Sequence, residues 1–202
     1  MRAPATAIND PAWLATQIAA TARLYGYDVR PTIGVLWWYS ASSVLLGPPV
    51  ESLIATGAAV DPALESMTLH LHADGRLIDA SSDSLLGNDI AALGRRLRET
   101  LSACVGAVSR GTGAPVRTLW AIATDSLANR VLWAGGSPSV AEKLALAVGP
   151  LLPMPRYVEV SGRLVVRRAS CCLIYQAPGQ AMCVSCPRQT PEERHRRLSN
   201  GG

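Results

Sequence analysis

The most constraining feature of this 202-residue chain is a cluster of four cysteines between positions 171 and 186. Cys171 and Cys172 are adjacent, and the stretch "LIYQAPGQAM" separates them from a Cys-x-x-Cys pair, Cys183 and Cys186. In a reducing compartment, thiols clustered in this way more often bind metal than form disulfides. The chain must therefore close a loop that brings two cysteine pairs together.

The sequence also bears on the compartment. The N-terminal stretch "MRAPATAINDPAW" lacks an apolar run and contains Asp10, so we do not expect a secretory signal. The longest uncharged stretch, between Arg30 and Glu51, contains serines and the breaker "GPP", which favours a buried helix over a membrane span. We therefore expect a cytoplasmic protein without a membrane span.

Hydrophobic residues make up 49% of the chain and charged residues 17%, which is typical of a globular protein. Caps, breakers and apolar periodicity predict helices over 11–26, 32–46, 50–57, 87–111 and 137–149, and over 116–136 they favour helix over strand after Asp125. The second of these is expected to end at Gly47-Pro48-Pro49, because proline disfavours a helix interior.

Two stretches predict β-hairpins. The run "MTLHLHADGRLIDAS" alternates around a turn at Asp74-Gly75, and "RYVEVSGRLVVRR" does so around Ser161-Gly162. This order of elements predicts an α+β fold with helices packed around a small antiparallel sheet. We expect a domain over 1–165, a cysteine-rich cluster-binding segment over 166–190 and a basic tail over 191–202.

The cysteine spacing leaves two metals open. Zinc requires four ligands in a tetrahedron, and Cys183 with Cys186 provides a good half-site. Cys171 and Cys172 provide a poor one, because adjacent side chains of an extended chain point to opposite faces. A [2Fe–2S] cluster offers two metal centres that each take two thiolates, so the chemistry favours iron–sulfur over zinc.

The pattern Cys-Cys-x₁₀-Cys-x₂-Cys resembles the signature of the FhuF-like ferric-siderophore reductases. The approach "GRLVVRRASCC" resembles that family's strand with paired arginines before the double cysteine. Upstream, "VLWWYSASSVLLGPP", "LHLHADGRL" and "LWAIATDSLANRVLW" resemble its tryptophan-rich helix, hairpin and central helix, in the family's order. The likeness spans about Arg30 to Arg188.

The resemblance implies one-electron reduction of siderophore-bound Fe(III) to Fe(II) in the cytoplasm. It implies a [2Fe–2S] cluster on Cys171, Cys172, Cys183 and Cys186, with no catalytic residue beyond the cluster. We find no triad, phosphate loop, flavin or nicotinamide fingerprint in the sequence, so electrons are expected from a ferredoxin or a ferredoxin reductase. A ferric siderophore is the expected substrate.

The positive charge gathers around the cysteines. The chain carries a net charge of +4, and residues 151–202 contribute +5, from eight arginines against three acids. We do not expect nucleic acid as a partner, because these arginines are not interleaved with stacking aromatic residues. Arg167, Arg168 and Arg188 are candidates to tune the cluster or to receive an acidic donor or an anionic iron complex.

Other side chains have two interpretations. Tyr175, Trp37 and Trp38 are candidate contacts of the substrate or the electron path, although core packing also explains the tryptophans. Cys104 is expected in the core, and His70 with His72 is expected on an exposed strand face rather than in a metal site. A helix cap and a surface or structural ion pair explain Asp125 and Arg130.

Two other classes of function remain open from the sequence. One is a non-enzymatic adaptor whose cysteines hold zinc and whose basic end binds a partner. The other is an iron–sulfur carrier or sensor that converts no substrate. Neither the identity of the siderophore nor that of the electron donor can be inferred from the residues alone.

Overall fold

The structure, a computed structural model, describes residues 1–200 and confirms the α+β fold class. The helices are α1 (Pro11–Tyr25), α2 (Arg30–Thr56), α3 (Ile90–Thr112), α4 (Val116–Trp133), α5 (Pro138–Val148) and α6 (Pro191–Asn200). The strands are β1 (Arg2–Pro4), β2 (Ala59–Val60), β3 (Met67–Leu71), β4 (Leu77–Ser82), β5 (Leu85–Gly87), β6 (Tyr157–Val160) and β7 (Arg163–Val166). Short 3₁₀ helices cover Ala5–Asn9 (η1), Leu64–Ser66 (η2) and Ile174–Gln176 (η3).

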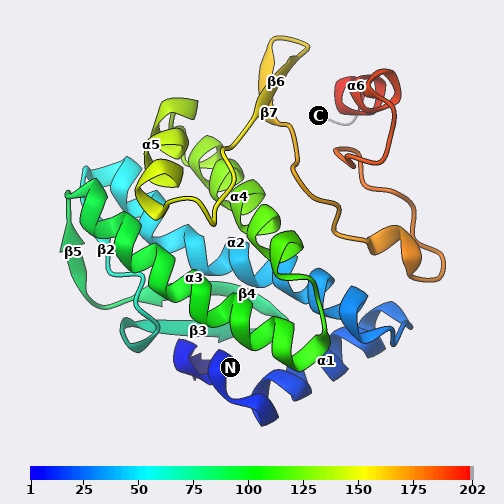
Figure 1. Cartoon of the computed structure of the whole chain (residues 1–202), viewed down its shortest axis with the longest axis horizontal. Helices are drawn as coiled ribbons and strands as arrows, with labels where there is room; N and C mark the ends of the chain where they lie inside the picture. The colour runs from blue at the N-terminus through cyan, green and yellow to red at the C-terminus, as the bar shows by residue number, and fades with distance from the viewer. Residues whose placement is uncertain (201–202) are drawn as a thin grey trace.

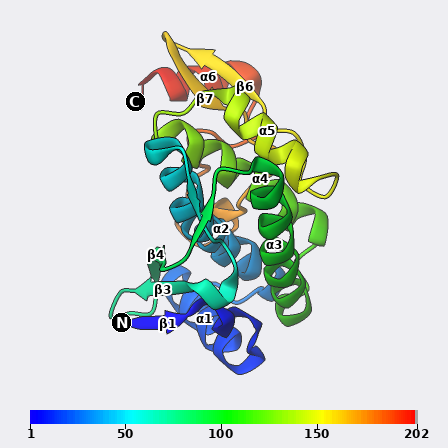
Figure 2. The same cartoon turned by 90° about the vertical axis from the view of Figure 1, so that its left-hand side faces the viewer.

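Helix α2 lies at the centre of the molecule and packs against α1, α3, α4 and strand β4. Figure 2 shows the β1–β3–β4 sheet at one end, the helices in the middle, and the β6–β7 hairpin with α6 at the other end. The cysteine segment runs from β7 to α6 along the side of α2 and α4 (Figure 1). The metal centre therefore lies well away from the main sheet.

All sheet pairing is antiparallel, in a three-stranded sheet of order β1-β3-β4 and two separate two-stranded ribbons. Both predicted hairpins are present, as β3–β4 and β6–β7. At the second turn, Ser161 and Gly162 both have positive φ, as a tight two-residue hairpin turn requires. The predictions missed β1, which is too short to show alternation and is recognisable only through its pairing with β3.

Most predicted helices are confirmed, and their caps explain where they begin. The Asp10 carboxylate accepts a hydrogen bond from the backbone N–H of Ala12 at 2.8 Å, and Asp89 does the same for Ala91 at the start of α3. Helix α1 ends at Gly26, which adopts the left-handed conformation. Helix α6 occupies most of the predicted tail, of which residues 201–202 lie outside the described residues.

The predicted end of the second helix at Gly47 is wrong. Helix α2 continues through Pro48 and Pro49 to Thr56, so the separate helix predicted over 50–57 is its last part. Each proline removes one backbone donor at a cost of about 3 kcal/mol. Long-range packing outweighs this cost, because this stretch of α2 is buried against the rest of the fold.

One contiguous core joins the helices to the main sheet. Trp38 is fully buried and donates its indole N–H to the carbonyl of Leu119 at 2.8 Å, which ties α2 to α4. Trp37 is 5% exposed and packs edge-to-face on Trp13. Among the described residues, no helix combines the length and apolarity needed to cross a bilayer.

Candidate metal centre

Helix α4 anchors the segment that leads into the double cysteine. Asp125, in the middle of α4, accepts hydrogen bonds from the backbone N–H groups of Ala169 at 2.7 Å and Ser170 at 3.2 Å. A carboxylate that accepts two backbone donors fixes both the position and the direction of the chain. The residue just before Cys171 is thus held directly to the core of the protein.

The chain then bends sharply, as two adjacent ligands require. Leu173 adopts a left-handed conformation with φ of 63°, and the 3₁₀ helix η3 follows at once. The N–H of Leu173 lies 3.4 Å from the sulfur of Cys171. This bend allows the adjacent thiols of Cys171 and Cys172 to lie on the same side of the backbone, close enough to form a hydrogen bond.

The second pair returns to the first through a tight turn. The N–H of Cys186 donates to the carbonyl of Cys183 at 3.1 Å, which folds the Cys-x-x-Cys stretch on itself. The sulfur of Cys186 then lies 3.7 Å from that of Cys171, and Cys183 hydrogen-bonds to Cys172. The structure therefore brings together all four predicted cysteines.

The arrangement of the sulfurs bears on which metal group they fit. They form a row, Cys183–Cys172–Cys171–Cys186, in which each thiol contacts the next. A tetrahedral zinc needs four ligands around one ion, whereas a [2Fe–2S] cluster takes two thiolates at each of two irons. The row of sulfurs fits the larger group.

Burial differs among the four cysteines. Cys172 is 4% exposed and Cys186 is 1% exposed, whereas Cys171 and Cys183 are only partly buried. Hydrogen bonds from the thiols of Cys171 and Cys183, together with the charge of Arg168, hold the pKa of Cys172 far below its usual range against the opposing effect of burial. The site is thus prepared to carry negative charge at its centre.

Arg168 supplies the compensating positive charge. Its side chain is 2% exposed, and its Nη1 lies 3.3 Å from the sulfur of Cys183. Its guanidinium stacks over the ring of Tyr39 at 4.7 Å, and its Nε lies 3.5 Å from a carboxylate oxygen of Asp125. Burial raises the pKa of Asp125 to about 6. Because this value is still below neutral pH, the carboxylate is ionised there and pairs with the arginine.

Two buried nitrogens of Arg168 have no well-formed hydrogen bond in the structure: Nη2 has no acceptor, and Nε has only the long 3.5 Å ion pair with Asp125. Such donors are costly to leave unpaired, and most buried donors in proteins have a partner. The acceptors that a [2Fe–2S] cluster would add at this place are thiolate and sulfide sulfurs. The orphaned guanidinium nitrogens and the set of four thiols are together the features that fit this group.

The structure separates the two paired arginines that the sequence treats alike. Arg168 points inward to Cys183, whereas Arg167 is exposed and lies in a groove beside β6 and α6. Arg188 is exposed and stacks on the ring of Tyr175 at 5.5 Å, next to the double cysteine. Of the two arginines in the pair, only Arg168 contacts a cysteine.

The tryptophan candidates lie elsewhere. Trp38 is sealed in the core, and Trp37 borders a separate cavity near α1 and the β3–β4 turn. The two histidines also do not form a pair. His70 hydrogen-bonds to Ser81 at 2.9 Å, and His72 lies 3.2 Å from a carboxylate oxygen of Asp74. Cys104 is fully buried in α3, as expected.

Sequence reasoning missed Asp125 and Tyr39 as parts of the site. Asp125 is not a helix cap, since it is 1% exposed and lies well inside α4. The available signal was a carboxylate in the middle of the apolar run "LWAIATDSLANRVLW", because a buried charge requires a partner. No comparable signal in the sequence distinguishes Tyr39 from the other tyrosines.

Four neighbouring thiols beside a buried arginine form a site that fits a cysteine-ligated iron–sulfur cluster. Comparison with protein families then specifies the type: residues 168–188 match the family model described as the FhuF 2Fe-2S C-terminal domain. The matched range begins at Arg168 and includes all four cysteines, which confirms the predicted resemblance in this segment. No curated protein gives a significant match to the chain.

This match identifies the cofactor of the cysteine segment as a [2Fe–2S] cluster, and the segment as similar to the C-terminal domain of FhuF-like proteins. The four thiols and Arg168 are the residues in the structure that would hold such a cluster. The match covers the cysteine segment alone, so the role of the helical part of the chain must be argued from its own geometry.

Proposed function

We propose that the protein is a ferric-siderophore reductase, which passes one electron at a time from a donor protein to siderophore-bound Fe(III). The observation that supports this most directly is the position of Cys171. It is the cysteine that borders an open cavity of about 540 Å³, whereas Cys172 and Cys186 are buried. A substrate in this cavity would lie next to a cluster ligand.

The chemistry of the cavity suits an oxygen-rich iron complex. Its walls include Thr32 and Thr118 from the first turns of α2 and α4, and Gln176 and Arg188 from the cysteine segment. Neither first turn contains an acidic residue, and neither helix has a side-chain cap. The positive ends of both helix dipoles therefore face the cavity unopposed. The Thr32 hydroxyl already donates to the Oε1 of Gln176 at 2.9 Å, so the Thr118 hydroxyl, the Gln176 amide N–H groups and the Arg188 guanidinium are the donors that match the oxygen ligands of siderophores.

In this proposal, the chain binds and orients rather than performing acid–base chemistry. When bound, a [2Fe–2S] cluster supplies one-electron transfer. Fe(III) gains one electron and becomes Fe(II), the donor protein loses one, and the siderophore releases the more labile ferrous ion. We propose that residues 1–165 form one wall of the substrate cavity, that 166–190 form the other wall and hold the cluster on Cys171, Cys172, Cys183 and Cys186, and that 191–202 form a separate basic element.

The test mixes anaerobically reduced protein with a ferric hydroxamate siderophore and a colorimetric ferrous chelator. We expect a ferrous signal well above that of cluster-free protein, accompanied by reoxidation of the cluster absorbance. Thr118→Glu places a negative charge and added bulk in the cavity, and should slow the reaction without loss of cluster. Ser139→Glu, in the first turn of α5 and exposed, is the matched control.

A result at background level for several siderophore classes, with an intact and fully reduced cluster, would contradict the proposal. The protein would then be an electron carrier or sensor. If Thr118→Glu and Ser139→Glu slow the reaction equally, the cavity at Cys171 is not the site where the substrate binds.

A further inference from the structure

A second groove lies on a different part of the protein, between the β6–β7 hairpin and helix α6. Its volume is about 910 Å³, and its apolar surface comes from Val158, Val160 and Leu198. Arginines line the same groove from both sides, Arg167 at the end of β7 and Arg194 on α6. The lining also includes Arg196 and one acidic residue, Glu192, so the groove combines an apolar floor with a rim on which arginines outnumber acidic residues.

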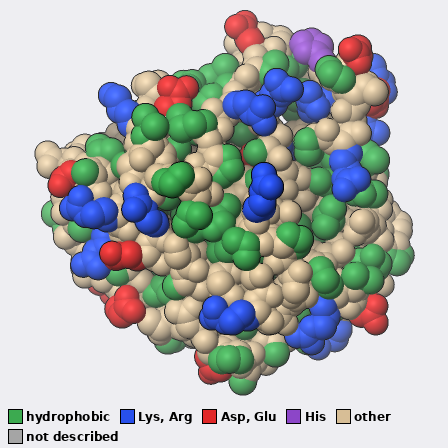
Figure 3. Space-filling view, viewed as in Figure 1, with side chains coloured by type: hydrophobic (Ala, Val, Ile, Leu, Met, Phe, Trp, Pro, Cys, Tyr) green, Lys and Arg blue, Asp and Glu red, His purple; other side chains and the backbone are tan. Residues whose placement is uncertain are grey.

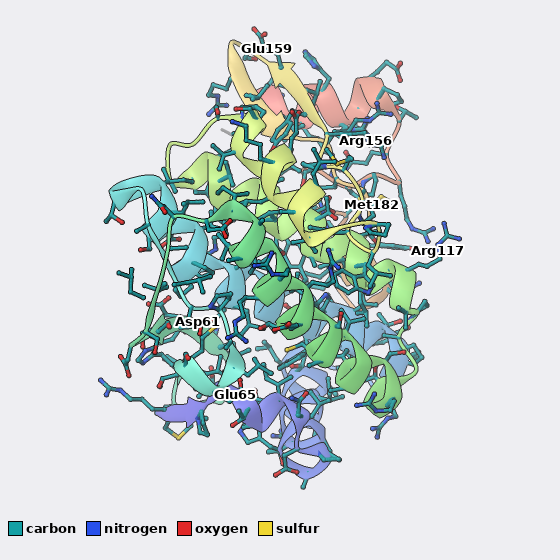
Figure 4. All side chains as sticks on the ribbon, turned by 60° about the vertical axis from the view of Figure 1, so that its left-hand side comes forward. Asp61, Glu65, Arg117, Arg156, Glu159 and Met182 are labelled. Atoms are coloured by element: carbon teal, nitrogen blue, oxygen red, sulfur yellow. The ribbon has the colours of Figure 1, made fainter. Side chains whose placement is uncertain are left out.

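The positive charge of this rim is largely uncompensated. Within residues 1–200, Arg156, Arg163, Arg167 and Arg194 form no ion pair, whereas Arg196 and Arg197 both pair with Glu193. Figure 3 shows Lys and Arg side chains gathered over the hairpin and α6 at the top of that view. In Figure 4, Glu159 points outward at the far end of the hairpin, away from Arg156.

The basic groove is physically connected to the cysteine loop. Arg197 of α6 donates to the carbonyl of Met182 at 3.0 Å, and the side chain of Gln189 donates to the carbonyl of Cys183 at 2.9 Å. Helix α6 is therefore held beside the second cysteine pair. Met182 and Val184, on either side of Cys183, are 36% and 46% exposed, and Met182 lies on the α6 side in Figure 4.

The two partly exposed cysteines, Cys171 and Cys183, therefore lie next to different surfaces of the protein. Cys171 borders the cavity formed by α2 and α4, and Cys183 lies between exposed apolar residues next to the basic groove. Cys172, which lies between them, is buried, and so is Cys186 on the far side of Cys171. The lining of the groove and the lining of the cavity at Cys171 share no residue, so a partner protein and a small molecule would have separate binding surfaces.

We infer that the groove between β6–β7 and α6, continued by Met182 and Val184, docks an acidic one-electron-transfer protein and receives its electron on the Cys183 side. The inference rests on the proposed function, in which electrons come from another protein. The donor is oxidised by one electron and the cluster held by the cysteines is reduced by one. Charge complementarity supports an acidic partner, because opposite charges steer association at small, transient interfaces.

The experiment measures cluster reduction by stopped-flow absorbance, with a reduced acidic plant-type [2Fe–2S] ferredoxin as the probe. Arg167→Glu combined with Arg194→Glu should lower the second-order rate constant at least tenfold at low salt, and the difference should shrink above about 0.1 M salt. The matched control is Arg23→Glu with Arg95→Glu, two exposed arginines on α1 and α3 outside the groove. It should leave the rate nearly unchanged.

Reduced methyl viologen, a small cation that needs no docking surface, serves as the second reductant. The groove variant should react with it at least as fast as the unmodified protein, and a redox titration should give the same potential. A similar loss with both reductants, or equal losses in the groove and control variants, would overturn the inference. If ferredoxin reduction depends on the groove but no siderophore iron is reduced, the docking surface stands and the proposed reductase fails.

Discussion

The ion pair between Asp125 and Arg168 should be essential for holding the cysteine segment on the protein. Asp125→Ala removes the acceptor of two backbone N–H groups and leaves Arg168, 5% exposed, without its carboxylate. Breaking a buried pair by removing one partner costs about 3–5 kcal/mol, because the remaining charge stays buried. An unpaired N–H costs about 1–3 kcal/mol, and this cost overlaps with the first.

We therefore expect Asp125→Ala to lower the free energy of unfolding by about 3–5 kcal/mol. In a domain of this length, each 1 kcal/mol changes the melting temperature by about 2–4 °C, so the expected drop is about 6–20 °C. The assay is anaerobic thermal unfolding of the cluster-loaded protein, followed by far-UV circular dichroism and by cluster absorbance. The cluster signal should be lost first, because Asp125 anchors the residues just before Cys171.

A double-mutant cycle separates the contribution of the Asp125–Arg168 ion pair to stability from that of the backbone hydrogen bonds that Asp125 accepts. Arg168→Met fills the same space without a charge, so adding it to Asp125→Ala should recover at least 1 kcal/mol of the loss. The reasoning would be refuted by a melting temperature within 2 °C of the unmodified protein for Asp125→Ala, or by strictly additive effects of the two substitutions.

Three further predictions follow from single sites. Gly94→Ala should lower the free energy of unfolding in urea by about 1–3 kcal/mol, because its Cβ would lie 2.5 Å from the backbone carbonyl carbon of Ala147. The control, Gly106→Ala, meets only a flexible arginine and should be neutral or stabilising. Cys183→Ser should purify with little iron, whereas Cys104→Ser should retain a full cluster, as measured by iron and acid-labile sulfide. Burial raises the pKa of Cys104 to about 12, so iodoacetamide at pH 8.5 should spare this thiol in folded, metal-free protein and modify it once urea is added. Alkylation of Cys104 at the rate of the other thiols would contradict its burial.

Local sequence signals predicted most of the elements. The caps at Asp10 and Asp89, the turn at Ser161-Gly162 and the alternation of the hairpins all act within a few residues, so they can be read without knowledge of the fold. The prediction that a helix ends at Gly47-Pro48-Pro49 was wrong because the outcome there depends on contacts with distant parts of the chain. The local penalty for proline is real, but burial along α2 decides the outcome.

The sequence by itself identified the four thiols, and their number and spacing limited the metal group to zinc or a [2Fe–2S] cluster. Only the tertiary structure decided which charged groups surround them. It turned Arg168 inward and Arg167 outward, and it brought Asp125 of α4 to the backbone of Ala169 and Ser170. It also left Cys171 and Cys183 partly exposed on different sides of the segment. The physical reason is that burial and charge pairing depend on contacts between residues distant in the chain, which no local pattern encodes.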